Sequence, residues 1–89
     1  MKDVWDLKAK NVVSNIRRVR EYRNYTQDYL AAKLKVSQNA YSKVELGYSK
    51  LTVDRLYRIA VILNVNIELL ITLNEGDLKE IIPDNKKKR

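Results

Sequence analysis

Four polar side chains that can recognise hydrogen-bonding partners fall close together near the middle of the sequence: Gln38, Asn39, Ser42 and Lys43. Their spacings of one, three and four residues place them on one face of a helix. The amides of Gln and Asn each present a donor and an acceptor, which suits the N6/N7 edge of adenine, and Lys43 can donate to guanine or to a phosphate. An ordinary solvated helix face explains the same residue types, so this chemistry depends on the elements around them.

Catalysis and metal binding have few candidates, because the 89-residue chain contains no histidine and no cysteine. The commonest general base and metal ligand are therefore missing, as are thiolate sites and cysteine nucleophiles. An enzyme would have to use Asp, Glu, Lys, Tyr or Ser alone, and the sequence offers no glycine-rich phosphate loop and no obvious acid pair. We expect a protein that is not an enzyme and that carries no metal and no cofactor.

The charge balance favours a polyanionic partner. The formal net charge is +7, and the last four residues, Lys86–Arg89, supply four of these positive charges. Residues 11–73 contain ten basic and five acidic side chains, so the body of the chain is basic as well as its end. Such an excess is typical of nucleic-acid binding, although solubility alone also explains it.

Helices are the expected elements, because only two glycines and one proline interrupt the chain. Val12, Ile16 and Val19 recur at spacings of four and three, which predicts an amphipathic helix over residues 11–23. The later helices are marked by good N-cap residues, a closing Gly or Asn, or both, and we expect them after Thr26, over Gln38–Leu46 after Ser37, from Thr52 to Asn64, and over Asn66–Ile71. The predicted class is all-α.

The ends of the chain lie outside this pattern. We divide the sequence into an N-terminal arm over residues 1–10, a helical domain over 11–73 and a C-terminal extension with a basic tail over 74–89. The arm holds the only tryptophan, Trp5, which is costly to leave in water and is expected to pack on the domain itself or on a second subunit. The apolar residues of the segment Leu78–Ile82 raise the same question.

The stretch from Thr26 to Gly47 resembles the helix-turn-helix of the Cro/CI-type (XRE) repressor family. Its sequence is TQDYLAAKLKVSQNAYSKVELG, and Asn15–Arg20 upstream and Leu56–Val65 downstream fit the same family. The resemblance covers residues 11–73. It implies a five-helix, lambda-repressor-like domain that binds double-stranded DNA as a sequence-specific transcriptional regulator, in particular a repressor, and as a homodimer on a two-fold symmetric operator.

The resemblance also implies roles for individual residues. The base-reading positions correspond to Gln38, Asn39 and Lys43, with Ser42 on the same face. Gln27 corresponds to a phosphate-binding residue at a helix N-terminus, and further candidates for phosphate contact are Ser37, Tyr48, Ser49, Lys50 and Arg17. An acid beside DNA would be repelled, so Glu45 is expected to point inward and to form a structural ion pair with Arg20.

The sequence departs from the family at four positions. Lys35 stands in the turn where glycine is common, so it must adopt a strained conformation or the turn must differ. Asn24 replaces another common glycine, which is an easy exchange. Leu46 replaces a frequent polar residue, and Tyr41 replaces an aliphatic one, so that its hydroxyl reaches either the DNA or the surface of the first helix.

A protein-interaction role is the main alternative to gene regulation. An antitoxin or antirepressor with the same fold would grip a protein partner through the arm around Trp5 or through the C-terminal extension. No apolar run approaches the ~20 residues that cross a membrane, and the first residues do not resemble a secretory signal. We expect a cytoplasmic protein with no membrane association. RNA binding is disfavoured, since no aromatic stacking platform is evident.

Overall fold

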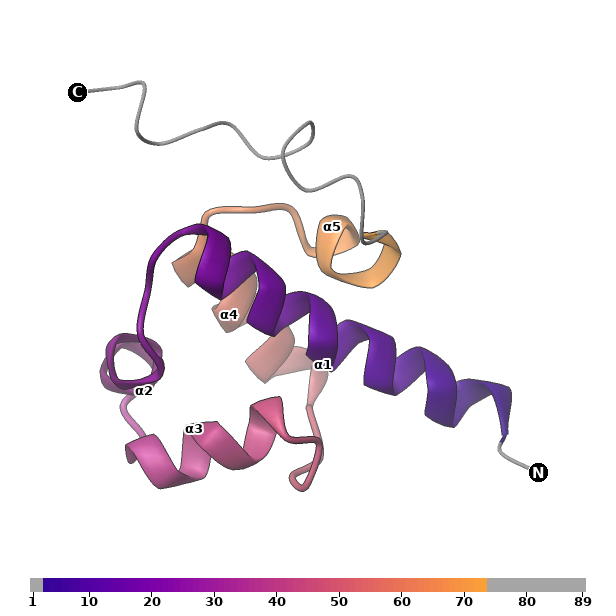
Figure 1. Ribbon diagram of the computed structural model, residues 1–89, viewed down its shortest axis with the longest axis horizontal. Coiled ribbons are helices and arrows are strands. Elements are labelled where there is room, and N and C mark those ends of the chain that lie inside the picture. Colours follow the sequence, from indigo (N-terminus) through magenta and orange to yellow (C-terminus); the bar gives the residue numbers. More distant parts are fainter. Residues whose placement is uncertain (1–2, 74–89) are drawn as a thin grey trace.

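The computed structural model describes residues 3–73, which form five α-helices and no strand within that range. The helices are α1 (Val4–Tyr22), α2 (Gln27–Leu34), α3 (Gln38–Glu45), α4 (Val53–Leu63) and α5 (Ile67–Thr72). The long α1 crosses the molecule, with α4 behind it, α5 along one side and the α2–α3 pair on the other (Figure 1). The all-α prediction of five helices is confirmed.

Three helices begin at the residues that the sequence indicated. The hydroxyls of Thr26, Ser37 and Thr52 each accept a hydrogen bond of 3.0 Å from the backbone amide three residues further on. Each cap satisfies one of the amides that the first turn of a helix leaves without a partner, and such a cap contributes about 1 kcal/mol. The caps therefore fix where α2, α3 and α4 start.

Left-handed residues redirect the chain after four of the helices. Asn24, Lys35 and Asn64 have φ of 64°, 63° and 59°, and Gly47 has φ of 79°. In each case the next residue's amide closes the turn onto a carbonyl five residues earlier, as from Val36 to Ala31 at 3.0 Å. Asn and Gly tolerate this conformation, but Lys35 adopts it at a cost of about 1–2 kcal/mol. The departure from glycine at Lys35 thus leaves the turn geometry intact.

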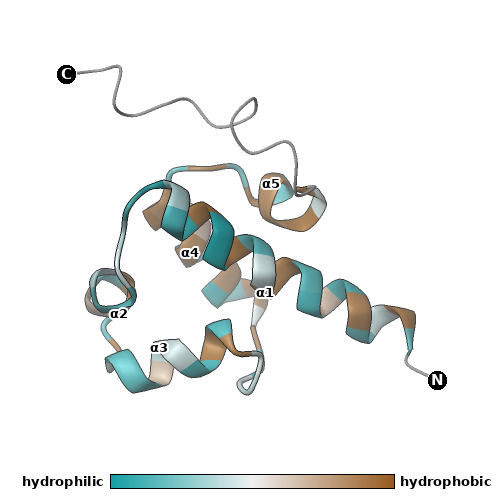
Figure 2. Ribbon diagram, in the orientation of Figure 1, coloured by the Kyte–Doolittle hydropathy of each residue, from teal (hydrophilic) through white to brown (hydrophobic). Residues whose placement is uncertain are grey.

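The core is built from the apolar faces of all five helices. Figure 2 shows hydrophobic ribbon along much of α4 and α5, the elements that lie against α1. The buried apolar side chains are Ile16 and Val19 of α1, Leu30, Ala31 and Leu34 of α2, Tyr41 and Val44 of α3, Ile59, Ala60 and Leu63 of α4, Leu70 of α5, and Leu73. This core holds the α2–α3 pair on one side of α1.

Two buried polar side chains, Asn15 on α1 and Arg23 directly after it, hold α5 and α4 in place, and neither role was predicted from the sequence. Asn15 Nδ2 donates to the carbonyl of Leu70 at 2.8 Å, which links α1 to α5. Arg23 Nε donates to the carbonyl of Leu63 at 2.9 Å, and its Nη2 donates to the carbonyl of Asn64 at 3.0 Å. Both side chains satisfy carbonyls that a helix end would otherwise leave unpaired.

The first helix starts earlier than its apolar periodicity predicts. Residues 1–10 were expected as an arm preceding the helix, but from Val4 onward this segment forms the first turns of α1. Every residue from Val4 to Asn11 is exposed, so no packing pattern marks these turns in the sequence. Trp5 does not pack on the domain; it is 71% exposed. In Figure 1 this end of α1 projects beyond the other helices.

The expectations for residues 74–89, which concern the segment Leu78–Ile82 and the basic residues Lys86–Arg89, lie outside the described residues. Across residues 3–73, none of the helices combines the length and the apolar character that crossing a membrane requires.

Candidate nucleic-acid interface

The pair α2 and α3 forms a rigid unit, joined by the turn Lys35-Val36-Ser37. Leu30, Ala31 and Leu34 on α2 and Tyr41 and Val44 on α3 are all buried in the core. Ala31 is almost completely buried between the helices, and its small side chain lets them approach closely. Because the apolar faces of both helices are buried in this packing, the opposite face of α3 is exposed to solvent. A helix presented in this way can enter a DNA major groove.

The open face of α3 carries the residues expected to read bases. Gln38, Asn39 and Lys43 are exposed, and Ser42 is half-buried beside them. Gln38 and Asn39 lie in the first turn, and the ribbon of α3 begins in strongly hydrophilic residues (Figure 2). Among the described residues, these side chains have no hydrogen-bonding partner that would tie them down. They are free to present amide and ammonium groups to a ligand in front of α3.

Ser37 has its acceptor already in use. Its Oγ accepts from the amide of Ala40 at 3.0 Å, so only its hydroxyl proton remains available to a phosphate. Tyr48, Ser49 and Lys50 follow α3 as an exposed loop, reached through the left-handed Gly47. This loop lies directly after the C-terminal end of α3 in the chain and carries three groups that can donate to phosphate oxygens.

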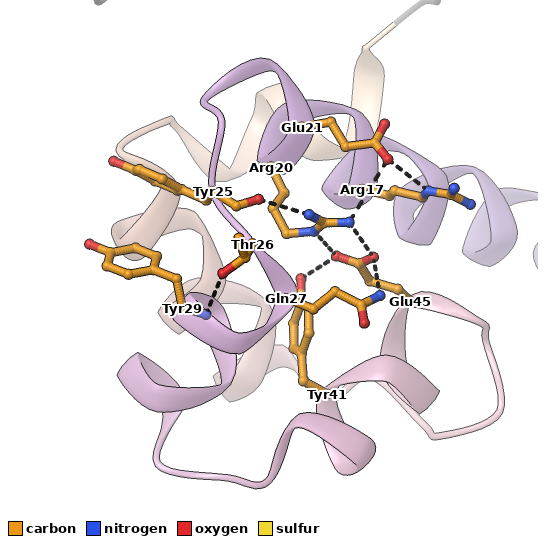
Figure 3. Close-up of polar contacts among 9 residues, drawn as sticks. All are labelled: Arg17, Arg20, Glu21, Tyr25, Thr26, Gln27, Tyr29, Tyr41 and Glu45. Atoms are coloured by element: carbon orange, nitrogen blue, oxygen red, sulfur yellow. Dashed lines mark hydrogen bonds and ion pairs between the residues drawn. The ribbon is translucent and has the colours of Figure 1, made fainter.

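Two expected phosphate contacts have partners within the protein. Gln27 Nε2 donates to Glu45 Oε1 at 3.1 Å, so this half-buried side chain is positioned by α3 (Figure 3). Arg17 Nε donates to Glu21 Oε2 at 3.2 Å on the exposed side of α1. The side chains of Arg17 and Glu21 are 61% and 53% exposed, and exposed i,i+4 pairs contribute only about 0.3–0.5 kcal/mol. Arg17 can therefore readily leave Glu21 for a phosphate. The Gln27 contact is the more restrictive of the two.

Glu45 points into the domain, away from the open face of α3. Its Oε2 lies 2.6 Å from Arg20 Nε, and its Oε1 lies 3.1 Å from Arg20 Nη2, which makes the pair bidentate. The two side chains are only 2% and 10% exposed. Arg20 Nη1 also donates to the carbonyl of Tyr25 at 2.8 Å, so the same guanidinium holds the loop before α2 (Figure 3).

The carboxylate of Glu45 accepts two further hydrogen bonds that the sequence did not predict. Tyr41 Oη donates to Oε2 at 2.7 Å, and Gln27 Nε2 donates to Oε1 at 3.1 Å. Tyr41 is fully buried, so its hydroxyl reaches neither the DNA face nor solvent. The four-residue spacing of Tyr41 and Glu45 on one helix was the available signal. The cluster joins α1, α2 and α3 through one charge.

The electrostatics of this cluster favour its charged form. Burial raises the pKa of Glu45, but the hydrogen bonds from Arg20, Tyr41 and Gln27 outweigh burial and leave that pKa below its ordinary value. The hydrogen bond to Glu45 raises the pKa of Arg20, against the effect of burial. Burial and the bond to Glu45 both raise the pKa of the Tyr41 phenol well above its usual range. The cluster therefore stays ionised and intact at neutral pH.

The sequence matches a known family over this region. A family model described as helix-turn-helix, of the XRE type, matches residues 16–70, which is more than half of the chain. The chain belongs to this family. Its members are DNA-binding regulators, and the five-helix architecture agrees with the lambda-repressor-like fold. No curated protein and no solved structure matches the chain.

Proposed function

We propose that this helix-turn-helix protein is a transcriptional repressor that binds a specific double-stranded DNA sequence through α3. One observation carries the proposal: the exposed polar side chains at the start of α3 have no internal partner, whereas the acid of the same helix is turned inward. Gln38, Asn39 and Lys43 thus present donors and acceptors at the surface, and Glu45 is 2% exposed. This arrangement suits base edges in a major groove and avoids repulsion by the phosphates.

Backbone contacts would place α3 in register with the bases. At the N-terminal end of α2, Gln27 is held by Glu45 and keeps its amide oxygen and remaining amide hydrogen for other partners. The helix N-terminus there favours an anion. The remaining candidates for phosphate contact are Ser37, Tyr48, Ser49, Lys50 and Arg17. Contacts of this kind fix orientation without reading sequence.

Two copies are expected to bind together. An eight-residue recognition helix covers few base pairs, and specific complexes of single small modules bury roughly 600–1,000 Å² of protein surface. A homodimer on a two-fold symmetric operator doubles this contact, with half-sites about one helical turn apart. A dimer bound in this way blocks other proteins from the same DNA, which is the basis of the repressor assignment. We expect such a regulator to act in the cytoplasm.

The decisive test selects bound sequences from a pool of random duplexes, using the full chain. We expect an inverted repeat whose half-site centres lie about 10–10.5 base pairs apart. Affinity for the selected duplex should fall with salt, with a log–log slope of about −0.9 per phosphate neutralised. Recovery of no preferred sequence, or an affinity that does not respond to salt, would remove the proposal.

A protein-binding role on the same fold, as in an antitoxin or antirepressor, is the second candidate, and the 71% exposure of Trp5 is what favours it. The two functions are separated by purifying the chain from the cells that produce it. A stoichiometric second protein that releases the chain from its selected duplex favours this candidate. Recovery of the chain with DNA alone favours the repressor.

A further inference from the structure

Helix α4 exposes a row of three apolar side chains on the face that points away from the core. Val53, Tyr57 and Val61 are 70%, 55% and 76% exposed. They lie four residues apart, so each is rotated by about 40° from the last and the row covers about 80° of the helix surface. Tyr57 lies about 160° around the helix from Ile59, which is completely buried. The outer row, defined as these three residues, is therefore separate from the face that packs on the domain.

The outer row makes α4 apolar on two faces. The inner face is buried in the core through Ile59, Ala60 and Leu63. The ribbon of α4 is accordingly hydrophobic along much of its length (Figure 2). A helix with apolar side chains all round is normally covered on every side, and an exposed apolar patch marks an interaction surface. The outer face of α4 is thus expected to have a partner outside the single chain.

A groove lies beside the outer row, between α2 and α4. It has a volume of about 320 Å³, and the residues that line it include Leu34 of α2 and Tyr57, Val61 and Ile62 of α4. A side chain that enters this groove contacts both helices at once. The surface therefore combines a projecting row with a recess next to it, which is the relief that two packed helices need.

The order of side chains in the outer row reads the same in both directions from Tyr57. A second α4 that crosses the first antiparallel at Tyr57 places its Val61 against Val53 and its Val53 against Val61. The two Tyr57 side chains then lie next to each other at the crossing point. Such an exchange of identical contacts is what a two-fold axis produces in an isologous dimer. The outer row is therefore complementary to a second copy of itself.

The charges next to the outer row obey the same symmetry. Asp54 and Arg58 lie on one side of the row and form an ion pair of 2.9 Å within the chain, with both side chains largely exposed. In the antiparallel crossing at Tyr57, the Asp54 of each copy lies only two residues, about 3 Å along the helix axis, from the level of Arg58 in the other. Each guanidinium then has an acid of either copy within reach, and the four charges sum to zero. The crossing therefore adds opposite charges and leaves no net repulsion.

We propose that the outer row is the self-association surface of this protein, and that its occupant is the antiparallel α4 of a second copy. This dimer rests on the proposed function in one respect, since a two-fold operator needs two copies held together. The row is small: its three side chains offer roughly half of the ~800 Å² per partner found in stable interfaces. The dimer is therefore weak and reversible in solution. DNA with two half-sites strengthens it by raising the effective concentration.

Sedimentation equilibrium of the full chain and its variants tests the surface. We expect the wild type to pass from monomer to dimer as its concentration rises from about 1 μM to about 1 mM. Tyr57→Ala and Val61→Ser should each raise the dimer dissociation constant, Tyr57→Ala roughly 10-fold or more. The matched control is Ile71→Ser, because Ile71 is an apolar residue of α5 that is 51% exposed.

Three outcomes of the sedimentation measurement overturn the proposal. One is a wild type that stays monomeric throughout the concentration range. Another is unchanged dimerisation in Tyr57→Ala and Val61→Ser. The third is an equal or greater loss in Ile71→Ser, which places the interface on α5. Circular dichroism of each variant verifies that the helices are still formed, so that a lost dimer is not mistaken for a lost fold.

Disulfide cross-linking tests the antiparallel crossing, since the chain contains no cysteine of its own. Tyr57→Cys places a thiol at the two-fold axis and should form a disulfide between two identical chains. Val53→Cys alone and Val61→Cys alone should not, because the two copies of either residue are eight residues, about 12 Å, apart along the axis. A mixture of Val53→Cys and Val61→Cys should cross-link. Cross-linking that is equal in all single variants, or absent from the mixture, contradicts the antiparallel crossing.

The outcome is independent of DNA binding, which is measured alongside. Val61→Ser should keep its affinity for a duplex with one half-site and lose the gain in affinity given by a second half-site. If no chain binds a selected duplex, the proposed function fails, while sedimentation and cross-linking still decide whether two α4 helices pair. If Val61→Ser retains the full gain from the second half-site, the outer row does not join the two copies on DNA.

Discussion

Arg20 on α1 and Glu45 at the end of α3 form a buried bidentate ion pair, with Nε 2.6 Å from Oε2. The pair joins the longest helix of the domain to the helix that carries the candidate base-reading residues. Gln27 on α2 donates to the same carboxylate, so a single charge orients both helices of the helix-turn-helix unit. Four hydrogen bonds onto one carboxylate explain how an acid is tolerated in a basic DNA-binding domain.

Removing this carboxylate should destabilise the fold. Glu45→Ala leaves the Arg20 guanidinium buried without its counter-charge, and the loss of one partner of such a pair costs about 3–5 kcal/mol. Urea denaturation of the variant and the wild type measures the difference in the free energy of unfolding. The control is Arg58→Ala, which breaks an ion pair of 2.9 Å whose side chains are 64% and 76% exposed, and which should cost below about 1 kcal/mol. Equal losses in the two variants would contradict a structural role for Glu45.

Acid should weaken the domain through the same residue. The pKa of Glu45 is below its ordinary value in the folded chain. The ionised carboxylate therefore stabilises the folded state at every pH above that ordinary value. This stabilisation is lost as the pH falls from the ordinary value of 4.5 through the lowered one. Glu45→Gln keeps the shape and removes the titration. The wild type should therefore lose more stability than Glu45→Gln between pH 7 and pH 3, measured by thermal unfolding. Parallel pH profiles for the two chains would show that the carboxylate is not perturbed by folding.

Local chemistry explains why much of the fold could be predicted from the sequence. Thr26, Ser37 and Thr52 are caps that act within three residues, and Asn24 and Asn64 close turns by their own backbone preference. Such features are legible because cause and effect are neighbours in the chain. The resemblance to a family added the expectation that Arg20 meets Glu45 across 25 residues, which periodicity alone does not reveal.

The features that were missed depend on contacts, or on their absence, in three dimensions. The helical turns over Val4–Asn11 contain no buried residue, so no apolar periodicity marked the true start of α1. Gln27 was expected at a phosphate, and its bond to Glu45 exists only because α2 and α3 are packed together. The buried Asn15 likewise acquires its role from a carbonyl on α5, 55 residues away. Pairings of this kind follow from the assembled helices.

Lys35 gives a prediction with the opposite sign. Its φ of 63° is strained for a residue with a Cβ, and Lys35→Gly should remove that strain. We expect the free energy of unfolding to rise by about 1 kcal/mol in spite of the greater flexibility of the unfolded chain. Ala32→Gly, in the regular part of α2, is the matched control and should instead lower stability by about 1 kcal/mol. A loss of stability in Lys35→Gly comparable with that of Ala32→Gly would mean that the turn carries no strain.

The base-reading face can be separated from the phosphate contacts by comparing specific and random DNA. Gln38→Ala and Asn39→Ala should each weaken binding to the selected duplex by about 1–3 kcal/mol, because a base edge loses its amide partner. Binding to random duplex should barely change, and so should stability, since both side chains are exposed. Lys50→Ala is the contrasting variant. It should weaken binding to both duplexes alike and reduce the log–log slope of affinity against salt by about one.

Competitive binding titrations at several salt concentrations measure all three variants on both duplexes. If Gln38→Ala and Asn39→Ala lose affinity equally on selected and random DNA, the two amides contact the backbone, and another part of the surface must read the sequence. If Lys50→Ala alone changes specificity, the exposed loop after α3 supplies that reading. Loss confined to the selected duplex in the two amide variants, with the Lys50→Ala loss shared by both duplexes, assigns sequence recognition to the first turn of α3.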